Sequence, residues 1–444
     1  MDWLDCLEQL DSDGSPPLDD LAATVAWYTD EEGVPVIPRK VWEELIGVHS
    51  QEAIKKALAD HIIGNNVPFP YQQITRAEVE HQFRRLRYVH VDDLVHSFDA
   101  AYQARFDYPR WTPDHGLGVL THNNRFNVIS NHYQQPNRWA CAGYRTPSPR
   151  QLWGDRKALE TLNWTFWRYT VRGVNRERFR HSFGISHYVA SQFKPQVAKV
   201  MYQWLGQGTV LDPSCGWGDR LAGFYCTTGA HTYIGTDPNR ACWETYQRQC
   251  LDYERFLGCP DPEIKRGTVE GFPFFTVRGS KTVTILCSPA EDVPWERLAP
   301  DGVDLVFTSP PYFGVEKYAE GTESEASQSW SRYPDFDDWR DGFLLPLVRR
   351  LSGLLTPSGH CAINIVDPFW KGNRMVACEP MGDALEAEGL RYSGFIAMDI
   401  RKRPTPNPDN EGLEAKYAEP IWVFSRGHDT PPLVEDALTM FIDP

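Results

Sequence analysis

The residues with the clearest chemical potential form one short run, Ser309-Pro310-Pro311-Tyr312. The serine hydroxyl and the Pro310 carbonyl, in a turn stiffened by two prolines, would place two hydrogen-bond acceptors side by side. Two acceptors suit an exocyclic amino group, which has two N–H donors, and Tyr312 offers a flat face for a planar base. Accepting both hydrogens would direct the nitrogen lone pair toward an electrophile. Taken alone, the run is equally compatible with an ordinary proline turn.

The segment that must position this tetrapeptide is the apolar run 303–307, which directly precedes it. Its composition is typical of a buried strand, with Thr308 at the carboxyl end. In open α/β sheets, ligands bind at the carboxyl ends of the strands. The sequence therefore predicts that the tetrapeptide lies at a ligand-binding edge.

A second informative segment reads as a strand, a glycine turn and a helix over residues 210–221. Gly216 and Gly218 would allow a positive φ and a close backbone approach to a ligand. About twenty residues further on, another strand ends at Asp237, whose carboxylate could accept hydrogen bonds from ribose hydroxyls. A glycine turn alone is common to many nucleotide-binding folds, but its combination with the acid and the tetrapeptide is a far more specific signal.

Strand and helix patterns alternate from residue 209 onward, which favours an α/β fold with a mostly parallel sheet and helices on both faces. Helical stretches are expected between most of the strands, notably over 239–257 and 335–355. The expected strands are 209–212, 232–237, 282–287, 303–308, 360–366, 392–399 and 419–425. The polar stretch 314–334 is expected to be a loop that becomes ordered when substrate binds.

Together, the glycine turn and the tetrapeptide resemble the DNA amino-methyltransferases, which methylate N6 of adenine or N4 of cytosine with S-adenosylmethionine. The resemblance covers residues 191–426 and implies a Rossmann-like methyltransferase fold with a seven-stranded, mostly parallel sheet. It assigns catalysis to the tetrapeptide, Ser309, Pro310, Pro311 and Tyr312. A serine-type tetrapeptide usually accompanies N4-cytosine in this family, so we favour cytosine over adenine. The runs 216–220 and 312–318 look most like phage and prokaryotic members.

The resemblance also implies where the cofactor would bind. The glycine turn corresponds to the family's cofactor loop, and Phe193 to an aromatic residue that closes over the methionine end, although it could equally be a helix-start staple. One of Ser288, Glu291 and Asp292 would contact the adenine. The expected cofactor-binding residues are Phe193, Asp212, Pro213, Cys215, Gly216, Gly218, Asp237, Pro238, Ser288, Glu291, Asp292 and Thr308.

Composition bounds the class of protein. A chain of 444 residues can form two or three domains, and its 41% hydrophobic content is that of a soluble protein. No apolar run approaches the ~20 residues needed to span a bilayer, and the first residues lack the features of a secretory signal. The ten cysteines show no C-x-x-C pair and no zinc-like spacing, which favours free thiols and no bound metal. With the resemblance, this predicts a cytoplasmic protein of a prokaryote or a phage-infected host cell.

Charge is unevenly distributed along the chain. The formal net charge is -15, but residues 1–36 carry ten acidic residues and no Lys or Arg. Residues 101–180 carry thirteen basic and five acidic residues, a net charge of +8. Local rather than global charge meets phosphate, so nucleic-acid binding stays compatible with the sequence.

Four regions are expected: an acidic segment 1–36, a mainly helical, basic and aromatic region 37–190, a catalytic domain 191–430 and a tail 431–444. The acidic segment would be a solvated, mobile tail or a short helical lead-in, or it would fold over the basic section as a phosphate mimic. The second region mixes arginines with aromatics, as nucleic-acid-binding surfaces do, although most of these aromatics could form a core. The expected nucleic-acid contacts are Arg172, Arg176, Arg178, Arg180, Arg401 and Lys402.

These observations predict a site-specific DNA methyltransferase that flips its target base, as in restriction–modification systems. Unlike most family members, the chain has no separate recognition domain between Asp212 and Ser309 or after Arg426. Recognition of duplex DNA must therefore come from the N-terminal region, from loops, or from a separate recognition or nuclease subunit. The alternatives are a methyltransferase of RNA or a nucleotide, and a non-catalytic DNA-binding or assembly subunit with the same fold.

Overall fold

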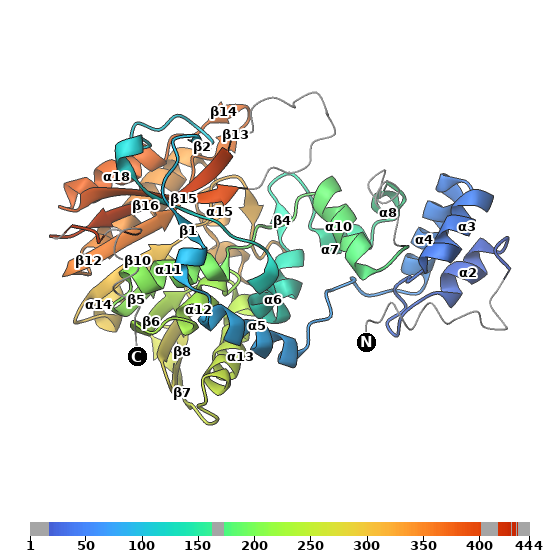
Figure 1. Cartoon of the computed structure of the whole chain (residues 1–444), viewed down its shortest axis with the longest axis horizontal. Helices are drawn as coiled ribbons and strands as arrows, with labels where there is room; N and C mark the ends of the chain where they lie inside the picture. The colour runs from blue at the N-terminus through green and yellow to red at the C-terminus, as the bar shows by residue number, and fades with distance from the viewer. Residues whose placement is uncertain (1–16, 162–172, 401–415, 428, 432, 434–444) are drawn as a thin grey trace. The chain divides into compact units, whose positions relative to one another are not determined.

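The computed structural model describes residues 17–161, 173–400, 416–427, 429–431 and 433 (Figure 1). The chain divides into two compact units, and the described parts of Met1–Gln73 and Arg138–Ala190 form the first. The second contains Ile74–Asn137 and the described part of Ser191–Pro444. Residues 74–137, which the sequence groups with the N-terminal region, therefore belong to the larger unit. The first sixteen residues of the acidic segment and most of the predicted C-terminal tail lie outside the described residues.

The first unit is mainly helical, as predicted for this region. Its helices include α2 (Leu21–Trp27), α3 (Arg39–Val48), α4 (Gln51–Gly64), α7 (Pro149–Trp153), α8 (Arg156–Thr161) and α10 (Arg176–Ser186). A cluster of rings forms its core: the ring of Phe69 lies 5.2 Å from that of Trp139 and 6.0 Å from those of Trp153 and Phe183. Trp139 and Trp153 are buried, so these two aromatics pack the core and do not present faces for bases.

The later half of the acidic segment belongs to this unit. Val25 and Val34 are fully buried in its core. Asp30 and Glu32 accept hydrogen bonds from the Arg176 guanidinium at 2.6 and 2.7 Å. Residues 17–36 are therefore not a solvated tail: they contain the short helix α2, as the alternative of a helical lead-in expects, and apolar residues between the acids find a hydrophobic partner in the fold.

The second unit is built on one large sheet. Within the described residues it has twelve strands in the order β1-β3-β15-β16-β12-β10-β5-β6-β9-β8-β7, with β2 paired to β16. Its strands are β1 (Val95–His96), β2 (Tyr102–Ala104), β3 (Gly116–Leu120), β5 (Gly208–Asp212), β6 (Ala230–Thr236), β7 (Glu263–Val269), β8 (Phe272–Arg278), β9 (Thr282–Leu286), β10 (Val303–Thr308), β12 (Leu355–Asn364), β15 (Arg391–Ile400) and β16 (Lys416–Ser425).

All seven predicted strands are present, and the central pairs from β12 through β10, β5 and β6 to β9 are parallel. The α/β class is confirmed, and the fold is Rossmann-like. The sheet is larger than predicted because the hairpin β7–β8 and strands β1 to β3 extend it. Strand β7 escaped prediction because most of its residues are polar and exposed, which removes the apolar pattern of a strand.

Helices cover both faces of this sheet. Those that follow its strands are α12 (Asp219–Tyr225), α13 (Arg240–Phe256), α14 (Trp295–Leu298), α17 (Leu345–Ser352) and α18 (Cys378–Ala387). Crossovers between parallel strands are right-handed. The connections that contain α12 and α13 run along the sheet in one direction, and those that contain α14, α17 and α18 run in the other, so the two groups of helices cover opposite faces. Further helices are α5 (Arg76–Arg87), α6 (Val128–Trp139) and α11 (Pro195–Leu205).

Two predicted segments differ in detail. The polar stretch 314–334 is not a single loop but contains β11 (Glu316–Lys317), a 3-10 turn and α15 (Ser329–Arg332). The helix expected over 335–355 begins with the short α16 (Phe336–Asp338), continues as a π-helical stretch and ends as α17. No helix among the described residues combines the length and apolar character needed to cross a membrane.

We predict that Trp153→Ala lowers the free energy of unfolding of the first unit by about 3–5 kcal/mol, because it empties a packed aromatic core. Urea denaturation followed by circular dichroism would measure the loss. Trp27→Ala is the matched control, since Trp27 is 54% exposed and Trp153 is 4% exposed. Equal effects of the two substitutions would contradict this core.

Candidate active site

The candidate site lies where the strand order of the sheet reverses. Strand β5 has β6, the next strand in the chain, on one side and β10 on the other, both parallel to it. Ligands in open α/β sheets bind at such a switch point, beyond the carboxyl ends of the strands. These three strands end at Asp212, Thr236 and Thr308. The glycine turn and the tetrapeptide, far apart in sequence, therefore follow neighbouring strand ends.

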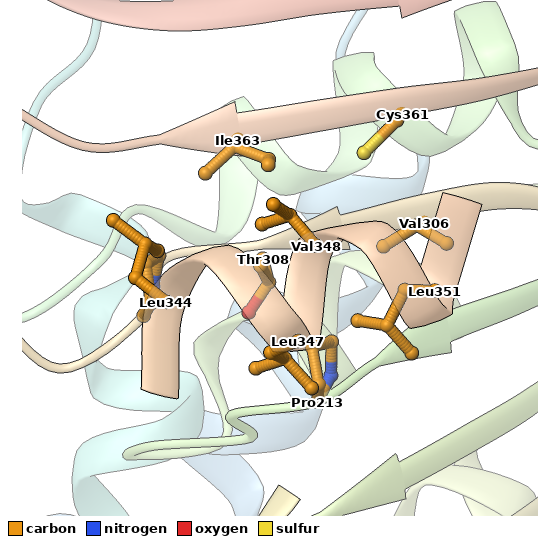
Figure 2. Close-up of a pocket in the computed structure, with 10 residues that line it drawn as sticks. Pro213, Val306, Thr308, Leu344, Leu347, Val348, Leu351, Cys361 and Ile363 are labelled. Carbon is orange, nitrogen blue, oxygen red and sulfur yellow. The ribbon is translucent and has the colours of Figure 1, made fainter. Parts of the chain in front are cut away.

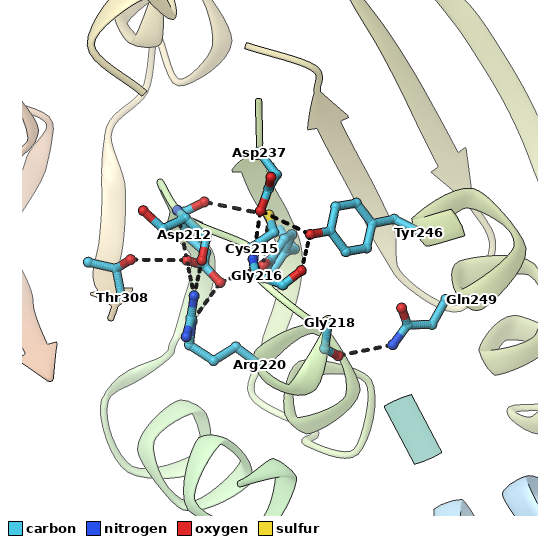
Figure 3. A network of polar contacts seen from close by, with 11 residues as sticks. Asp212, Cys215, Gly216, Gly218, Arg220, Asp237, Tyr246, Gln249 and Thr308 are labelled. Carbon is cyan, nitrogen blue, oxygen red and sulfur yellow. Dashed lines mark hydrogen bonds and ion pairs between the residues drawn. The ribbon is translucent and has the colours of Figure 1, made fainter. Parts of the chain in front are cut away.

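Asp212 is fully buried, and its carboxylate joins several elements (Figure 3). It accepts hydrogen bonds from Arg220 Nε at 2.8 Å and Nη2 at 3.2 Å. It also accepts from the hydroxyl of Tyr233 at 2.7 Å and from that of Thr308 at 3.2 Å. Asp212 therefore supports the loop from inside, and the bond from Thr308 ties the strand of the tetrapeptide to the strand of the glycine turn.

Asp237 closes the glycine turn. The Gly216 amide donates to Asp237 Oδ2 at 2.9 Å, and the Tyr246 hydroxyl donates to the same oxygen at 3.1 Å (Figure 3). The Asn239 amide donates to Oδ1 at 2.9 Å. Burial nevertheless raises the pKa of Asp237 to about 6. A small part of this residue stays exposed at the end of β6, next to the half-buried Pro238.

The glycine turn leaves space on one side. Gly216 and Gly218 adopt φ values of +59° and +72°, which other residues rarely take. A Cβ atom added at Gly216 would meet nothing closer than 3.7 Å, whereas one at Gly218 would lie 2.4 Å from Gln249. Gly218 therefore packs closely against Gln249, whereas the space beside Gly216 is open, although its N–H and its carbonyl are engaged by Asp237 and Tyr246. Burial raises the pKa of Cys215 well above its usual range, so its thiol packs without reacting.

Pro213 and Thr308 line a small apolar cavity between α17 and the strands β10 and β12 (Figure 2). Its volume of about 10 Å³ would hold about one water molecule, far too little for a nucleotide. Pro310 also lines it, together with four aliphatic side chains of the π-helical stretch and α17: Leu344, Leu347, Val348 and Leu351. The cavity therefore belongs to the packing behind the site.

The segment before α11 lies over the glycine turn. The indole N–H of Trp217 donates to the Ser191 carbonyl at 2.8 Å, and its ring centroid lies 5.7 Å from that of Tyr318. The Ser191 amide donates to the carboxylate of Glu316 at 3.1 Å. The sequence alone does not predict the contacts among Trp217, Ser191 and Glu316. The role of a bulky tryptophan in a glycine turn depends on its partner, which lies elsewhere in the sequence. Phe193 lies nearby, its ring 5.4 Å from the Arg220 guanidinium carbon.

The three candidates after β9 are engaged in other contacts. The Ser288 hydroxyl donates to the neighbouring Pro289 carbonyl at 3.0 Å. The carboxylates of Glu291 and Asp292 pair with Arg332 at 3.2 and 2.7 Å. Burial raises the pKa of Glu291. Glu291 and Asp292 therefore lie beside the end of α15 and hold it in place.

The tetrapeptide leads to residues that the sequence did not single out. The Tyr312 hydroxyl donates to Oε1 of Glu419 in β16 and lies 3.3 Å from the Asn364 carbonyl at the end of β12. The Ser309 side chain lies next to this hydroxyl. Burial and the charge of Glu419 raise the pKa of Tyr312 far above its usual range, so this phenol stays protonated. No pattern in one sequence marks Glu419, because β16 lies far along the chain.

Two of the expected nucleic-acid contacts are engaged within the first unit. Arg176 pairs with Asp30, and Arg180 donates to the Pro70 carbonyl at 2.7 Å. Burial lowers the pKa of Arg180 to about 10. Arg178 is half-buried. Arg176 and Arg180 therefore stabilise this unit. The remaining expected contacts lie outside the described residues: Arg172, Arg401 and Lys402.

No protein-family model matches this sequence, and no curated protein matches it. Solved structures with a similar fold include Trm1 from Pyrococcus horikoshii with S-adenosyl-L-methionine (TM-score 0.31, 12% identity, 53% of this chain and 56% of that one). Others are precorrin-6y C5,15-methyltransferase from Geobacter metallireducens (0.29, 10%, 52% and 87%) and the cyclopropane synthase MmaA2 from Mycobacterium tuberculosis (0.27, 12%, 46% and 63%). The match thus spans about half of the Trm1 chain, and the likeness concerns the fold alone.

We predict that Arg220→Met destabilises the second unit by about 3–5 kcal/mol, because it leaves the buried Asp212 carboxylate without its cation. Urea denaturation of both proteins would measure the difference. The double variant Asp212→Leu/Arg220→Met should recover part of the loss, since no charge is then buried unpaired. A single variant as stable as the wild type would contradict this role.

Proposed function

We propose that this chain is an S-adenosylmethionine-dependent methyltransferase that methylates the exocyclic amine of a base in DNA, N4 of cytosine in preference to N6 of adenine. The observation that carries the proposal is the junction of the two motifs. The tetrapeptide and the glycine turn follow adjacent parallel strands, joined by the Thr308–Asp212 hydrogen bond of 3.2 Å. An acceptor-rich turn and a nucleotide-type loop thereby meet at the switch point of the sheet.

The residues at this edge fit the cofactor. Gly216 leaves space for a ligand to pass close to the backbone, and the carboxylate of Asp237 would accept hydrogen bonds from ribose hydroxyls. When bound, S-adenosylmethionine would supply an activated methyl group: a nitrogen–carbon bond forms, the carbon–sulfur bond breaks, and its electron pair stays on sulfur. Because the methyl group is already activated, the chain's main task is to position the amine.

The amine would be held by the tetrapeptide. The Ser309 hydroxyl and the Pro310 carbonyl would accept its two N–H groups, and the ring of Tyr312 would stack on the base. A base inside a duplex cannot reach such a turn, so the target nucleotide would have to be flipped out. The serine at the first position favours cytosine, as in the family that the motifs resemble. A separate recognition or nuclease chain remains part of the proposal.

We predict that affinity for S-adenosylmethionine falls as the pH drops through about 6, because protonation of Asp237 removes an acceptor for the ribose hydroxyls. Isothermal titration from pH 8 to pH 5 would measure the dissociation constant. Asp237→Asn should bind weakly at every pH in this range. A wild-type affinity that is independent of pH would contradict the assigned contact.

The proposed activity is tested by transfer of labelled methyl from S-adenosylmethionine to unmodified DNA, with mass spectrometry of the nucleosides. We expect N4-methylcytosine in the product. Ser309→Ala should lower turnover by about 100-fold, the scale of one preorganised transition-state hydrogen bond, and leave cofactor affinity unchanged. Ser280→Ala is the matched control, because Ser280 is exposed in the turn between β8 and β9, at the other end of β9 from the site.

Each other outcome of this assay has a definite meaning. If the product is N6-methyladenine, the target base is adenine and not cytosine, and the proposed methyl transfer to DNA still holds. If the chain binds the cofactor and transfers label to RNA but not to DNA, the substrate is RNA and not DNA. A chain that binds no cofactor would instead be a binding or assembly subunit, and the proposed activity would be wrong.

A further inference from the structure

A path of hydrogen bonds leads from the tetrapeptide to a carboxylate. The Ser309 side chain lies next to the Tyr312 hydroxyl, and that hydroxyl donates to Oε1 of Glu419. The Asn364 side-chain amide donates to the same oxygen at 3.3 Å and to the Pro420 carbonyl at 3.0 Å. Hydrogen bonds thus connect Tyr312, Glu419 and Asn364, and Asn364 fixes where the carboxylate lies.

The carboxylate of Glu419 has one engaged oxygen and one that is available. Both of its hydrogen bonds from described residues reach Oε1, and none from the described part of the chain reaches Oε2. The residue is half-buried. Oε2 would therefore bind or release a proton without disturbing the hydrogen bond from Tyr312 to Oε1.

Methylation of an aromatic amine creates a proton that must leave. The neutral nitrogen becomes positively charged when it forms the new bond to carbon, and it regains neutrality only by losing one N–H proton. Ser309 would already accept that N–H, but a serine hydroxyl is far too weak a base to keep the proton. A carboxylate is a much stronger base than a hydroxyl and can receive the proton within the site.

We infer that Glu419 is the terminal proton acceptor of the proposed methyl transfer and acts through Tyr312 and Ser309. The amine proton passes to Ser309 Oγ, the serine proton passes to the Tyr312 oxygen, and the tyrosine proton passes to Oε1 of Glu419. One N–H bond breaks and one carboxyl O–H bond forms, while each hydroxyl loses one proton and gains another. This inference rests on the proposed function and adds the destination of the proton.

The surroundings of Glu419 suit this role. Burial raises its pKa, and the hydrogen bonds from Tyr312 and Asn364 and the charge of Arg105 oppose the rise, while the charge of Glu316 adds to it. The net result is a carboxylate that is more basic than an exposed one. Since it must be ionised to accept a proton, turnover should fall as the pH drops through this raised pKa.

The test compares Glu419→Gln with the wild-type chain. Glutamine keeps the size of the side chain and an acceptor for the Tyr312 hydroxyl, but its amide cannot keep a proton. With S-adenosylmethionine kept saturating at every pH, so that protonation of Asp237 does not limit the rate, turnover at neutral pH should fall by about 100-fold, the lower end of the range for a general base, and the acid limb of the pH profile should disappear. The dissociation constant of S-adenosylmethionine should not change, and Glu419→Asp should recover part of the turnover.

A control variant and a second measurement distinguish proton acceptance by Glu419 from a purely structural role. Asp399→Asn removes a half-exposed acid on the neighbouring strand β15, opposite Ala418, and should leave turnover and the pH profile unchanged. Infrared titration of the protein without cofactor should show a carboxyl band that protonates above the usual range of glutamate. That band should be absent in Glu419→Gln and present in Asp399→Asn.

Three results would overturn the inference. A Glu419→Gln variant with wild-type turnover and an unchanged acid limb would exclude the relay while leaving the proposed methyl transfer intact. A variant that loses turnover but keeps the acid limb, with no recovery in Glu419→Asp, would show that Glu419 only supports the turn. A wild-type chain that methylates no nucleic acid would instead overturn the proposed function, and the relay with it.

Discussion

The second unit depends on the burial of one ion pair. Asp212 has no exposed surface, and a carboxylate taken out of water costs several kcal/mol unless it is fully paired. It is paired here by Arg220 of α12 and by hydroxyls of Tyr233 in β6 and Thr308 in β10. Because the donors come from three different elements, the cost is met only when all of them are in register. The ion pair therefore specifies how the strands that carry the site are aligned.

The other parts of the site are fixed relative to this pair. The Gly216 amide reaches Asp237 at the end of β6, and Trp217 reaches the segment before α11. The tetrapeptide continues from Thr308 and reaches Glu419 of β16. Strand β16 runs antiparallel to β12, so its early residues lie at the edge where the parallel strands end. This reversal explains how a residue late in the chain joins a site built on earlier strands.

Charge that is segregated in the sequence is neutralised in the fold. Acidic Asp30 and Glu32 lie in a segment without basic residues, and Arg176 lies in a stretch with a net charge of +8. In the structure these three side chains form ion pairs within the first unit. The basic stretch is also divided, because residues 101–137 belong to the second unit. A run of positive charge along a chain is therefore not the same as a positive surface.

The sequence by itself determined the α/β class, the seven central strands and the two motifs at their ends. These features are local: apolar periodicity marks a strand, and glycines or prolines mark the turn that follows it. Only the tertiary structure decided that Asp212 supports the loop from inside, that Glu291 and Asp292 pair with Arg332, and that Glu419 meets Tyr312. Each of these depends on a partner many residues away, and a side chain's role follows from its partner as much as from its own type.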